Sequence, residues 1–274
     1  MVSYINIISS QAKAIDDSVT EKPFKIIDSE EEEQIFKYVD TNSGKAKISA
    51  ISSKLNGQKV AIIGLGGTGS YILDFVSKTP VKEIHLYDGD LFIQHNAFRS
   101  PGAISLDELR GLLKKADYFQ SLYSKMRYNL FAHSYYLNNQ NIDELLEMSF
   151  VFICIDKSEI KKVIIEKLVS QGIPFIDTGI GVLNVDNSLI GHIRVTTGTP
   201  EKVDHLKTRI TVSDDGGNND YATNIQIAEL NALNAALAVV KWKKLFGFYQ
   251  DQNLEYNSVY SINDGVLINE DNLI

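Results

Sequence analysis

The residues best suited to chemistry in this chain are glycines and charged side chains that follow short apolar runs. The apolar run 60–63 is followed at once by four glycines, Gly64, Gly66, Gly67 and Gly69. Glycines in this place let the backbone approach a phosphate closely, and a helix that begins beyond them points free N–H groups at the anion. Asp88 lies 19 positions after Gly69 and ends a second apolar run, where an acid accepts a hydrogen bond from a ribose hydroxyl. This spacing favours a nucleotide site over a plain tight turn between strand and helix.

More polar residues of useful type come after Asp88. Asp90 places a second carboxylate at the same strand end, and Asn96 and Arg99 are three positions apart, so both can project from one turn of backbone. Lys115 stands beside Lys114 at the start of an expected helix. A lysine pair is typical of a solvated helix face, and its place after a nucleotide-binding unit makes a phosphate contact the alternative.

Another apolar run, 150–155, ends at Asp156. The carboxyl ends of parallel strands form the ligand crevice of open α/β sheets, so Asp88 and Asp156 are expected to face one crevice. Cys154 reads as an inward strand residue, and apolar surroundings raise a thiol pKa, which argues against a nucleophile. The five histidines are scattered without ligand spacing, which argues against a histidine metal site or a catalytic triad.

The elements that must position these residues alternate between strand and helix patterns. The expected fold class is α/β, a Rossmann-like, mostly parallel sheet with helices on both faces that antiparallel strands extend. Strands are expected at 60–63, 84–87, 150–155, 173–177 and 189–196, with a hairpin over 257–268. Helices are expected near 28, at 48–55, from 70, and at 107–111, 114–130, 158–171 and 224–244; the stretches 41–47, 179–181 and 197–221 read as a polar loop, a tight glycine connection and a long polar loop.

The domain organisation that these patterns predict has three parts. Residues 1–56 form an N-terminal helical arm or a surface extension, and residues 57–200 form a nucleotide-binding Rossmann-like domain. Residues 201–274 supply a cover loop, a long helix and a C-terminal hairpin of the same domain. The chain of 274 residues is long enough for this arrangement.

Composition excludes several classes of protein. The net charge of −8 argues against a nonspecific nucleic-acid binder. The apolar windows are too short to span a bilayer, and the N-terminal stretch lacks the features of a secretory signal, so we expect a cytoplasmic location. A single cysteine excludes an intramolecular disulfide and a Cys-x-x-Cys zinc site.

Five ordered motifs, KVAIIGLGGTGS, YDGD, HNAFR, KKAD and FICID, together resemble the ThiF/MoeB superfamily over residues 57 to about 200. IPFIDTGIGV and GHIRVTTGTP are similar to a compact bacterial branch of it. The resemblance implies an enzyme that uses ATP to adenylate the C-terminal carboxylate of a ubiquitin-like protein, forming an acyl-adenylate and pyrophosphate. It implies ATP and Mg²⁺ as cofactors, and as partners a ubiquitin-like protein with a C-terminal glycine, a separate conjugating protein and a second copy in a homodimer.

The resemblance also implies roles for individual residues. The four glycines line the nucleotide, Asp88 holds the ribose hydroxyls, and Asp90 and Asn96 shape the phosphate and ribose pocket. Arg99 and Lys115 contact the triphosphate. Asp156 helps to place Mg²⁺ near the α-phosphate.

This sequence departs from the superfamily pattern in two places. The N-terminal RYxRQ-like segment, which supplies an arginine in many relatives, often across a dimer interface, is absent. Lys45 is our candidate substitute, and its action within one chain or across a dimer stays open. The loop 197–221 has no cysteine, so we expect adenylation without a thioester on this chain.

Two other functions stay open at this point. The glycines and Asp88 also fit an NAD- or FAD-dependent oxidoreductase, which leaves Arg99, Lys115 and Asp156 without a role. The chain also fits the non-catalytic partner subunit of a heterodimeric activating enzyme, although such subunits typically lose one of those three residues.

Overall fold

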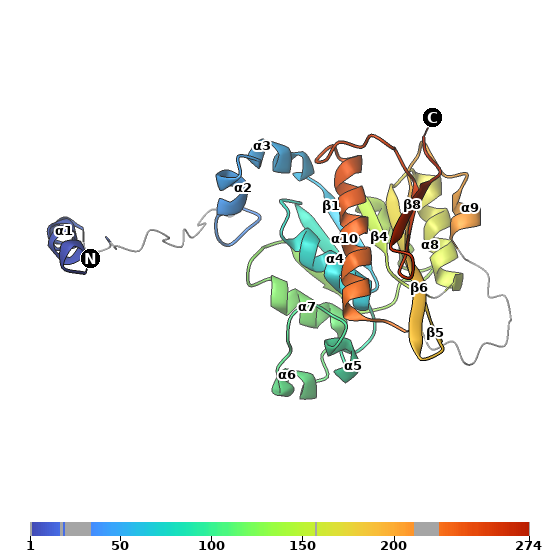
Figure 1. Ribbon diagram of the computed structural model, residues 1–274, viewed down its shortest axis with the longest axis horizontal. Helices are drawn as coiled ribbons and strands as arrows, with labels where there is room; N and C mark the ends of the chain where they lie inside the picture. The colour runs from blue at the N-terminus through green and yellow to red at the C-terminus, as the bar shows by residue number, and fades with distance from the viewer. Residues whose placement is uncertain (1, 17–18, 20–33, 157, 211–224, 274) are drawn as a thin grey trace.

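The computed structural model describes residues 2–16, 19, 34–156, 158–210 and 225–273. Its centre is a mixed sheet with the strand order β3-β2-β1-β4-β5-β6-β7-β8 (Figure 1). The strands are β1 (Lys59–Ile63), β2 (Glu83–Tyr87), β3 (Leu130–His133), β4 (Phe150–Ile153), β5 (Phe175–Val185), β6 (Ser188–Gly198), β7 (Asn257–Ser261) and β8 (Val266–Glu270).

The strands from β3 to β5 are parallel, and β1 pairs with both β2 and β4. All four residues of β4 are buried, as are residues 60–63 of β1. Such continuous apolar strands are typical of a parallel sheet that is covered on both faces. After β1 the chain adds β2 and β3 on one side and then β4 and β5 on the other, so the order of strands reverses at β1. Ligands bind at the carboxyl ends of the strands at such a switch point.

The last three strands are antiparallel, with β6 against β5, β7 against β6 and β8 against β7. This confirms the expected α/β class with antiparallel extension, including the hairpin near the C-terminus.

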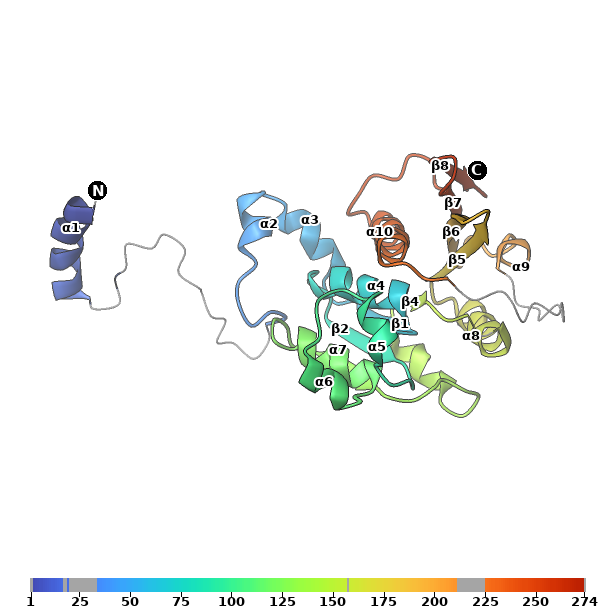
Figure 2. The same ribbon diagram turned by 60° about the horizontal axis from the view of Figure 1, so that its bottom comes forward.

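Helices cover both faces of the sheet (Figures 1 and 2). On one face α4 and α10 pack together around a core that includes Ile72, Leu73 and Trp242. On the other face α8 and η2 cover a core that includes Ile164, Leu168 and Leu145. The helices are α1 (Val2–Ile15), α2 (Thr41–Lys45), α3 (Ser49–Ser52), η1 (Ser53–Leu55), α4 (Gly67–Ser77), α5 (Gln94–Ala97), α6 (Leu106–Arg110), α7 (Lys115–Tyr123), η2 (Ile142–Glu147), α8 (Ser158–Gln171), α9 (Leu206–Arg209) and α10 (Ala228–Leu245).

Three expectations about the elements are wrong. The expected polar loop at 41–47 contains α2, whose N-terminus is capped because the carboxylate of Asp40 accepts hydrogen bonds from two backbone N–H groups. The expected helix at 114–130 ends at Tyr123, and the chain continues into the strand β3, which the sequence patterns missed. The expected connection at 179–181 lies inside β5, where the missing side chain of Gly179 leaves room for Arg194 on the neighbouring strand.

The expected helix near residue 28 and residues 211–221 of the expected long polar loop lie outside the described residues. The described part of that loop begins with the end of β6 and includes α9, so it is not entirely a loop. Of the described helices, none has the length and apolar character that crossing a bilayer requires.

Candidate functional site

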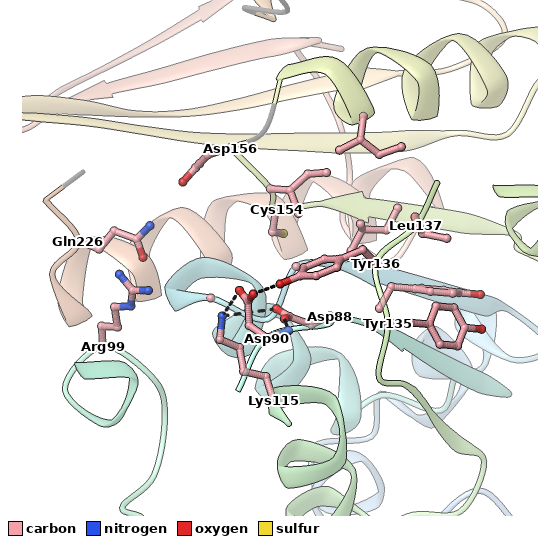
Figure 3. A pocket seen from close by; sticks show the side chains of 16 residues that line it. Asp88, Asp90, Arg99, Lys115, Tyr135, Tyr136, Leu137, Cys154, Asp156 and Gln226 are labelled. Carbon is pink, nitrogen blue, oxygen red and sulfur yellow. Dashed lines mark hydrogen bonds and ion pairs between the residues drawn. The ribbon is translucent and has the colours of Figure 1, made fainter. Parts of the chain in front are cut away.

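A pocket of about 460 Å³ lies at the carboxyl ends of β1, β2 and β4 (Figure 3). Its size falls in the range of roughly 300–1,000 Å³ that is usual for small-molecule sites. The pocket is lined by seven of the residues that the sequence singled out, namely Gly64, Gly66, Asp88, Asp90, Arg99, Lys115 and Asp156.

The glycine turn between β1 and α4 forms one wall of the pocket, and its four glycines have different surroundings. Gly64 has a φ of +88°, a left-handed conformation that favours glycine. A Cβ added at Gly66 would meet no atom within 4 Å, so the space beside this residue is open to a ligand. Gly67 and Gly69 do not line the pocket: a Cβ on Gly67 would lie 2.0 Å from the amide of Asn231, and a Cβ on Gly69 would lie 1.9 Å from the carbonyl oxygen of Gly64. These two glycines let α4 pack closely against α10 and against the turn.

Asp88 is held firmly by backbone groups at the end of β2. Its Oδ2 accepts a hydrogen bond from the N–H of Leu65 at 2.6 Å, and its Oδ1 accepts one from the N–H of Asp90 at 2.8 Å. The residue is 7% exposed. Burial raises the pKa of Asp88 above its ordinary value, although the charge of Lys115 and both N–H groups oppose this shift. A carboxylate fixed in this way at the pocket is suited to accept hydrogen bonds from ligand hydroxyls.

Lys115 begins α7 and reaches both aspartates of the β2 end. Its Nζ lies 2.8 Å from Oδ2 of Asp90 and 3.8 Å from Oδ2 of Asp88. The other oxygen of Asp90 accepts a hydrogen bond from the hydroxyl of Tyr136, and this bond raises the pKa of Tyr136 to about 12. The lysine pair is therefore split, because Lys115 enters the pocket while Nζ of Lys114 donates to the carbonyl of Ser134.

Arg99 and Gln226 lie side by side at the opposite end of the pocket from the two tyrosines, with Asp156 above them (Figure 3). Burial lowers the pKa of Arg99, and the nearby charge of Asp156 opposes this shift. Nε of Arg99 and Oε1 of Gln226 are buried without a hydrogen-bond partner among the described residues. These atoms are available to a ligand that supplies an acceptor and a donor.

Cys154 lies in the pocket wall directly after β4. Burial raises the pKa of its thiol to about 12, in line with the expectation that this cysteine is a poor nucleophile.

Besides Gly67 and Gly69, two of the predicted site residues do not line the pocket. Asn96 is buried in α5, where its Oδ1 accepts a hydrogen bond from the N–H of Ile93, so it shapes the turn that carries Arg99. Lys45 ends α2, which precedes the amino end of β1, whereas the pocket is at the carboxyl end (Figure 1). Lys45 therefore cannot serve the pocket of its own chain in this arrangement.

Sequence reasoning missed four residues of the pocket wall. Tyr135, Tyr136 and Leu137 follow β3, and they were overlooked because no strand was expected between residues 130 and 149. Gln226 precedes α10 in a stretch without any motif.

A magnesium ion fits this site only as a partner of a bound phosphate. The described residues contain no group of three or more His, Cys, Asp or Glu side chains arranged to hold a metal. Mg²⁺ is commonly bound by one or two carboxylates together with substrate phosphates and water, and Asp156 is an exposed carboxylate of this kind.

The comparisons with known proteins agree with this geometry. The model of the ThiF family matches residues 42–252, and that of a domain of unknown function (DUF6791) matches residues 1–41. None of the curated proteins matches the chain.

Solved structures with the same fold include PaaA and MccB. A crystal structure of PaaA superposes with a TM-score of 0.64 at 16% identity, covering 96% of this chain and 80% of PaaA. MccB from E. coli superposes with a TM-score of 0.65 at 18% identity, covering 81% of this chain and 64% of MccB. A structure of E. coli MccB with ATP gives a TM-score of 0.59 at 19% identity, covering 81% of this chain and 65% of MccB.

The family model spans well over half of the sequence, and it includes every residue that lines the pocket. This chain therefore belongs to the ThiF family.

Proposed function

We propose that this protein uses ATP to adenylate the C-terminal carboxylate of a peptide chain, with a ubiquitin-like protein that ends in glycine as its partner. The observation that carries the proposal is the convergence of Asp88, Arg99, Lys115 and Asp156 on one pocket beside the glycine turn. Membership of the ThiF family supports it, as do the solved structures of MccB with ATP and of MccB with MccA.

Each side chain has a defined part in this proposal. Asp88 accepts hydrogen bonds from the ribose hydroxyls. Gly66 leaves the turn open to the phosphates, and Gly64 supplies the left-handed conformation of the turn. Arg99 and Lys115 contact the triphosphate, and Asp156 holds Mg²⁺, which neutralises phosphate charge when bound. Asn96 acts indirectly, through the turn before Arg99.

The chemistry requires positive charge more than it requires a base. An oxygen of the carboxylate bonds to the α-phosphorus while the bond to the bridging oxygen of the β-phosphate breaks, so pyrophosphate leaves and an acyl-adenylate remains. Both reactants are anions, and the carboxylate is already ionised. At 4 Å and an effective dielectric constant near 20, each opposite charge pair contributes about 4 kcal/mol before desolvation.

The partner-specific parts of the proposal rest on two features of the chain. Its only cysteine is Cys154, whose thiol is held neutral by burial, so the adenylate passes to an acceptor outside this chain, such as a separate conjugating protein. A homodimer is needed if Lys45 takes the place of the absent arginine, because Lys45 ends α2, before the amino end of β1 and away from the pocket of its own chain. We also retain the division into an arm, an adenylation domain and a cover segment as a proposal.

The test is ATP–pyrophosphate exchange with a purified β-grasp protein that ends in glycine, preferably one encoded next to this chain. Exchange that depends on the partner's terminal carboxylate and disappears in Asp156→Ala supports the proposal. ATP binding without exchange, at any partner concentration, would favour the non-catalytic subunit instead. Binding of NAD but not ATP would favour an oxidoreductase.

A further inference from the structure

A continuous line of polar side chains runs along β2 and β3 and ends at the pocket. Nε2 of His85 lies 3.2 Å from Oε2 of Glu83, and Nδ1 of His85 lies 3.0 Å from Nε2 of His133. Nδ1 of His133 lies 2.9 Å from the hydroxyl of Tyr135, which lies 2.7 Å from Oε2 of Glu144. We name these five residues the histidine chain.

The four contacts of the histidine chain need more protons than its neutral side chains carry. Each contact joins two atoms at hydrogen-bond distance, so each needs one proton between them. A neutral imidazole carries one N–H and a tyrosine carries one O–H, while an ionised carboxylate carries none. His85, His133 and Tyr135 thus supply three protons for four contacts.

We propose that the histidine chain binds one proton beyond this neutral complement, and that the added proton holds Tyr135 in position in the pocket wall. With it, His85 donates to Glu83 and to His133, His133 donates to Tyr135, and Tyr135 donates to Glu144. Every contact then has a donor and an acceptor. In this arrangement the doubly protonated ring is His85, which lies next to the carboxylate of Glu83. Burial, followed by the neighbouring His85, lowers the pKa of His133.

The charges around the histidine chain favour a bound proton. Lys59 on β1 lies 3.1 Å from Glu83 and 3.6 Å from Glu147, and Lys82 lies 3.8 Å from Glu83. Together with Glu144 on η2, these groups amount to three carboxylates against two ammonium groups, a net charge of −1. The rings add no charge: Phe131 stacks on His85, and Tyr87 stacks on His133 with centroids 4.2 Å apart.

Loss of the added proton leaves three protons for the four contacts. If His85 and Tyr135 keep donating to the two carboxylates, the single N–H of His133 serves either His85 or Tyr135, so the contact between His133 and Tyr135 lacks its proton in one of the two tautomers. Tyr135 lines the pocket, and so does Tyr87, whose ring stacks on His133. If the pocket binds ATP, as the proposed function requires, the affinity for ATP falls as the pH rises through the range in which histidines titrate, about pH 6 to 8.

The first measurement uses the nucleotide-free protein and does not depend on the proposed function. Histidine ring NMR signals are followed against pH in the wild type, in Tyr135→Phe and in Tyr128→Phe, a control tyrosine of similar exposure (42% against 40%). In Tyr135→Phe two contacts remain between Glu83, His85 and His133, and two neutral imidazoles supply both protons. We expect His85 and His133 to titrate with one midpoint in the wild type and in the control, and this midpoint to fall by about one pH unit in Tyr135→Phe. Equal midpoints in all three proteins would overturn the shared proton.

The second measurement is the Kd of Mg-ATP at pH 6.5 and pH 8.5 by calorimetry. We expect binding by the wild type and by Tyr128→Phe to weaken several-fold more than binding by Tyr135→Phe. Comparison of the variants cancels the titration of ATP itself and of His95, which lies near Arg99. The same ratio of affinities in all three proteins would overturn the positioning role of the histidine chain. Failure of ATP to bind at both pH values would overturn that role together with the proposed function, while the NMR result would still decide the shared proton.

Discussion

Lys115 offsets the negative charge of two aspartates in a pocket that we propose binds an anionic ligand. Three carboxylates and two cations line the pocket, so it is not basic by composition. The carboxylate of Asp88 accepts hydrogen bonds from two backbone N–H groups. The carboxylate of Asp90 accepts hydrogen bonds from Nζ of Lys115 and from the hydroxyl of Tyr136. Both acids are therefore engaged by hydrogen-bond donors of the protein itself. Arg99 and Lys115 remain the groups that can face phosphate oxygens.

The first prediction concerns these two cations. We expect Arg99→Ala and Lys115→Ala each to slow ATP–pyrophosphate exchange about a hundredfold, because each removes roughly 3 kcal/mol of charge stabilisation in the transition state. Exchange rates at saturating partner concentration measure the effect. Arg110→Ala is the matched control, since Arg110 is exposed and pairs with the exposed Asp107, away from the pocket lining. Unchanged exchange in Arg99→Ala or Lys115→Ala would contradict the assigned roles.

At the scale of elements, the pocket depends on how closely α4 approaches its neighbours. Gly69 lets the first turn of α4 rest on the carbonyl of Gly64, and Gly67 lets Asn231 of α10 come into contact. Asn231 also accepts a hydrogen bond from the hydroxyl of Thr68, while Nδ2 of Asn234 donates to the carbonyl of Gly179 on β5. The two asparagines that interrupt the apolar face of α10 thus tie this helix to the glycine turn and to the sheet.

The second prediction compares two glycines in helices. Gly69→Ala places a Cβ 1.9 Å from a backbone oxygen, so we expect it to lower the free energy of unfolding by more than about 2 kcal/mol and to weaken ATP binding. Gly44→Ala in α2 meets no atom within 4 Å, and we expect it to be neutral or to stabilise by about 0.5–1 kcal/mol. Urea unfolding measures both changes. Similar stabilities of the two variants would show that close packing at Gly69 is unimportant.

The third prediction concerns the ion pairs that join α10 to the segment before β7. Nζ of Lys241 lies 2.8 Å from Asp251, and Nζ of Lys244 lies 3.3 Å from it. Burial raises the pKa of Asp251, but these two lysines outweigh burial and hold the pKa below its ordinary value. A lowered carboxyl pKa contributes stability above the ordinary value near pH 4, and this contribution is lost as the pH falls through the lower folded value.

We therefore expect Asp251→Asn to lower the free energy of unfolding by about 3 kcal/mol at pH 7. The difference from the wild type should shrink as the pH falls from 4 to 2, because the wild-type carboxyl then becomes neutral as well. Urea unfolding across this range measures the change. Asp107→Asn, at an exposed position, is the control and should show no such trend. A difference that is constant with pH would contradict the charge-based explanation.

At the scale of the whole molecule, the sheet divides into two kinds of surface. The parallel half has its switch point between β2 and β4 and carries the pocket. The antiparallel half, from β6 to β8, ends in an edge strand with exposed apolar residues, among them Val266, Leu267 and Ile268. The ligand site and the open edge of the sheet are therefore several strands apart in one continuous sheet.

The fourth prediction concerns the stability of the whole fold. We expect Mg-ATP at one hundred times its Kd to stabilise the protein by about 2.7 kcal/mol, because it binds the folded state alone. For a chain of this size, this corresponds to a rise of roughly 5–10 °C in the melting temperature. Thermal unfolding with Mg-ATP, with NAD and without ligand measures it. A rise with NAD and none with Mg-ATP would contradict an ATP site.

Local spacing in the sequence was enough to predict the first strand, the glycine turn, α4 and the acid at the end of β2. These features depend on neighbours within about 30 positions, and periodicity and turn residues encode them directly. It was also enough to predict that Asp88 and Asp156 lie at one sheet edge, because the carboxyl ends of parallel strands meet there. The place of Arg99 and Lys115 beside them was expected from the family resemblance.

Only the tertiary structure decided which glycines face the pocket and which pack against α10, since that depends on Asn231, more than 160 positions away. It also placed Tyr135 and Tyr136 in the wall, because β3 is a short strand whose register is set by pairing with β2 rather than by its own pattern. The structure likewise placed Lys45 near the amino end of β1, away from the pocket, and no local pattern in the sequence gives this position. Residue types and short spacings follow from the chain, whereas contacts between distant segments follow from how the sheet and its helices pack.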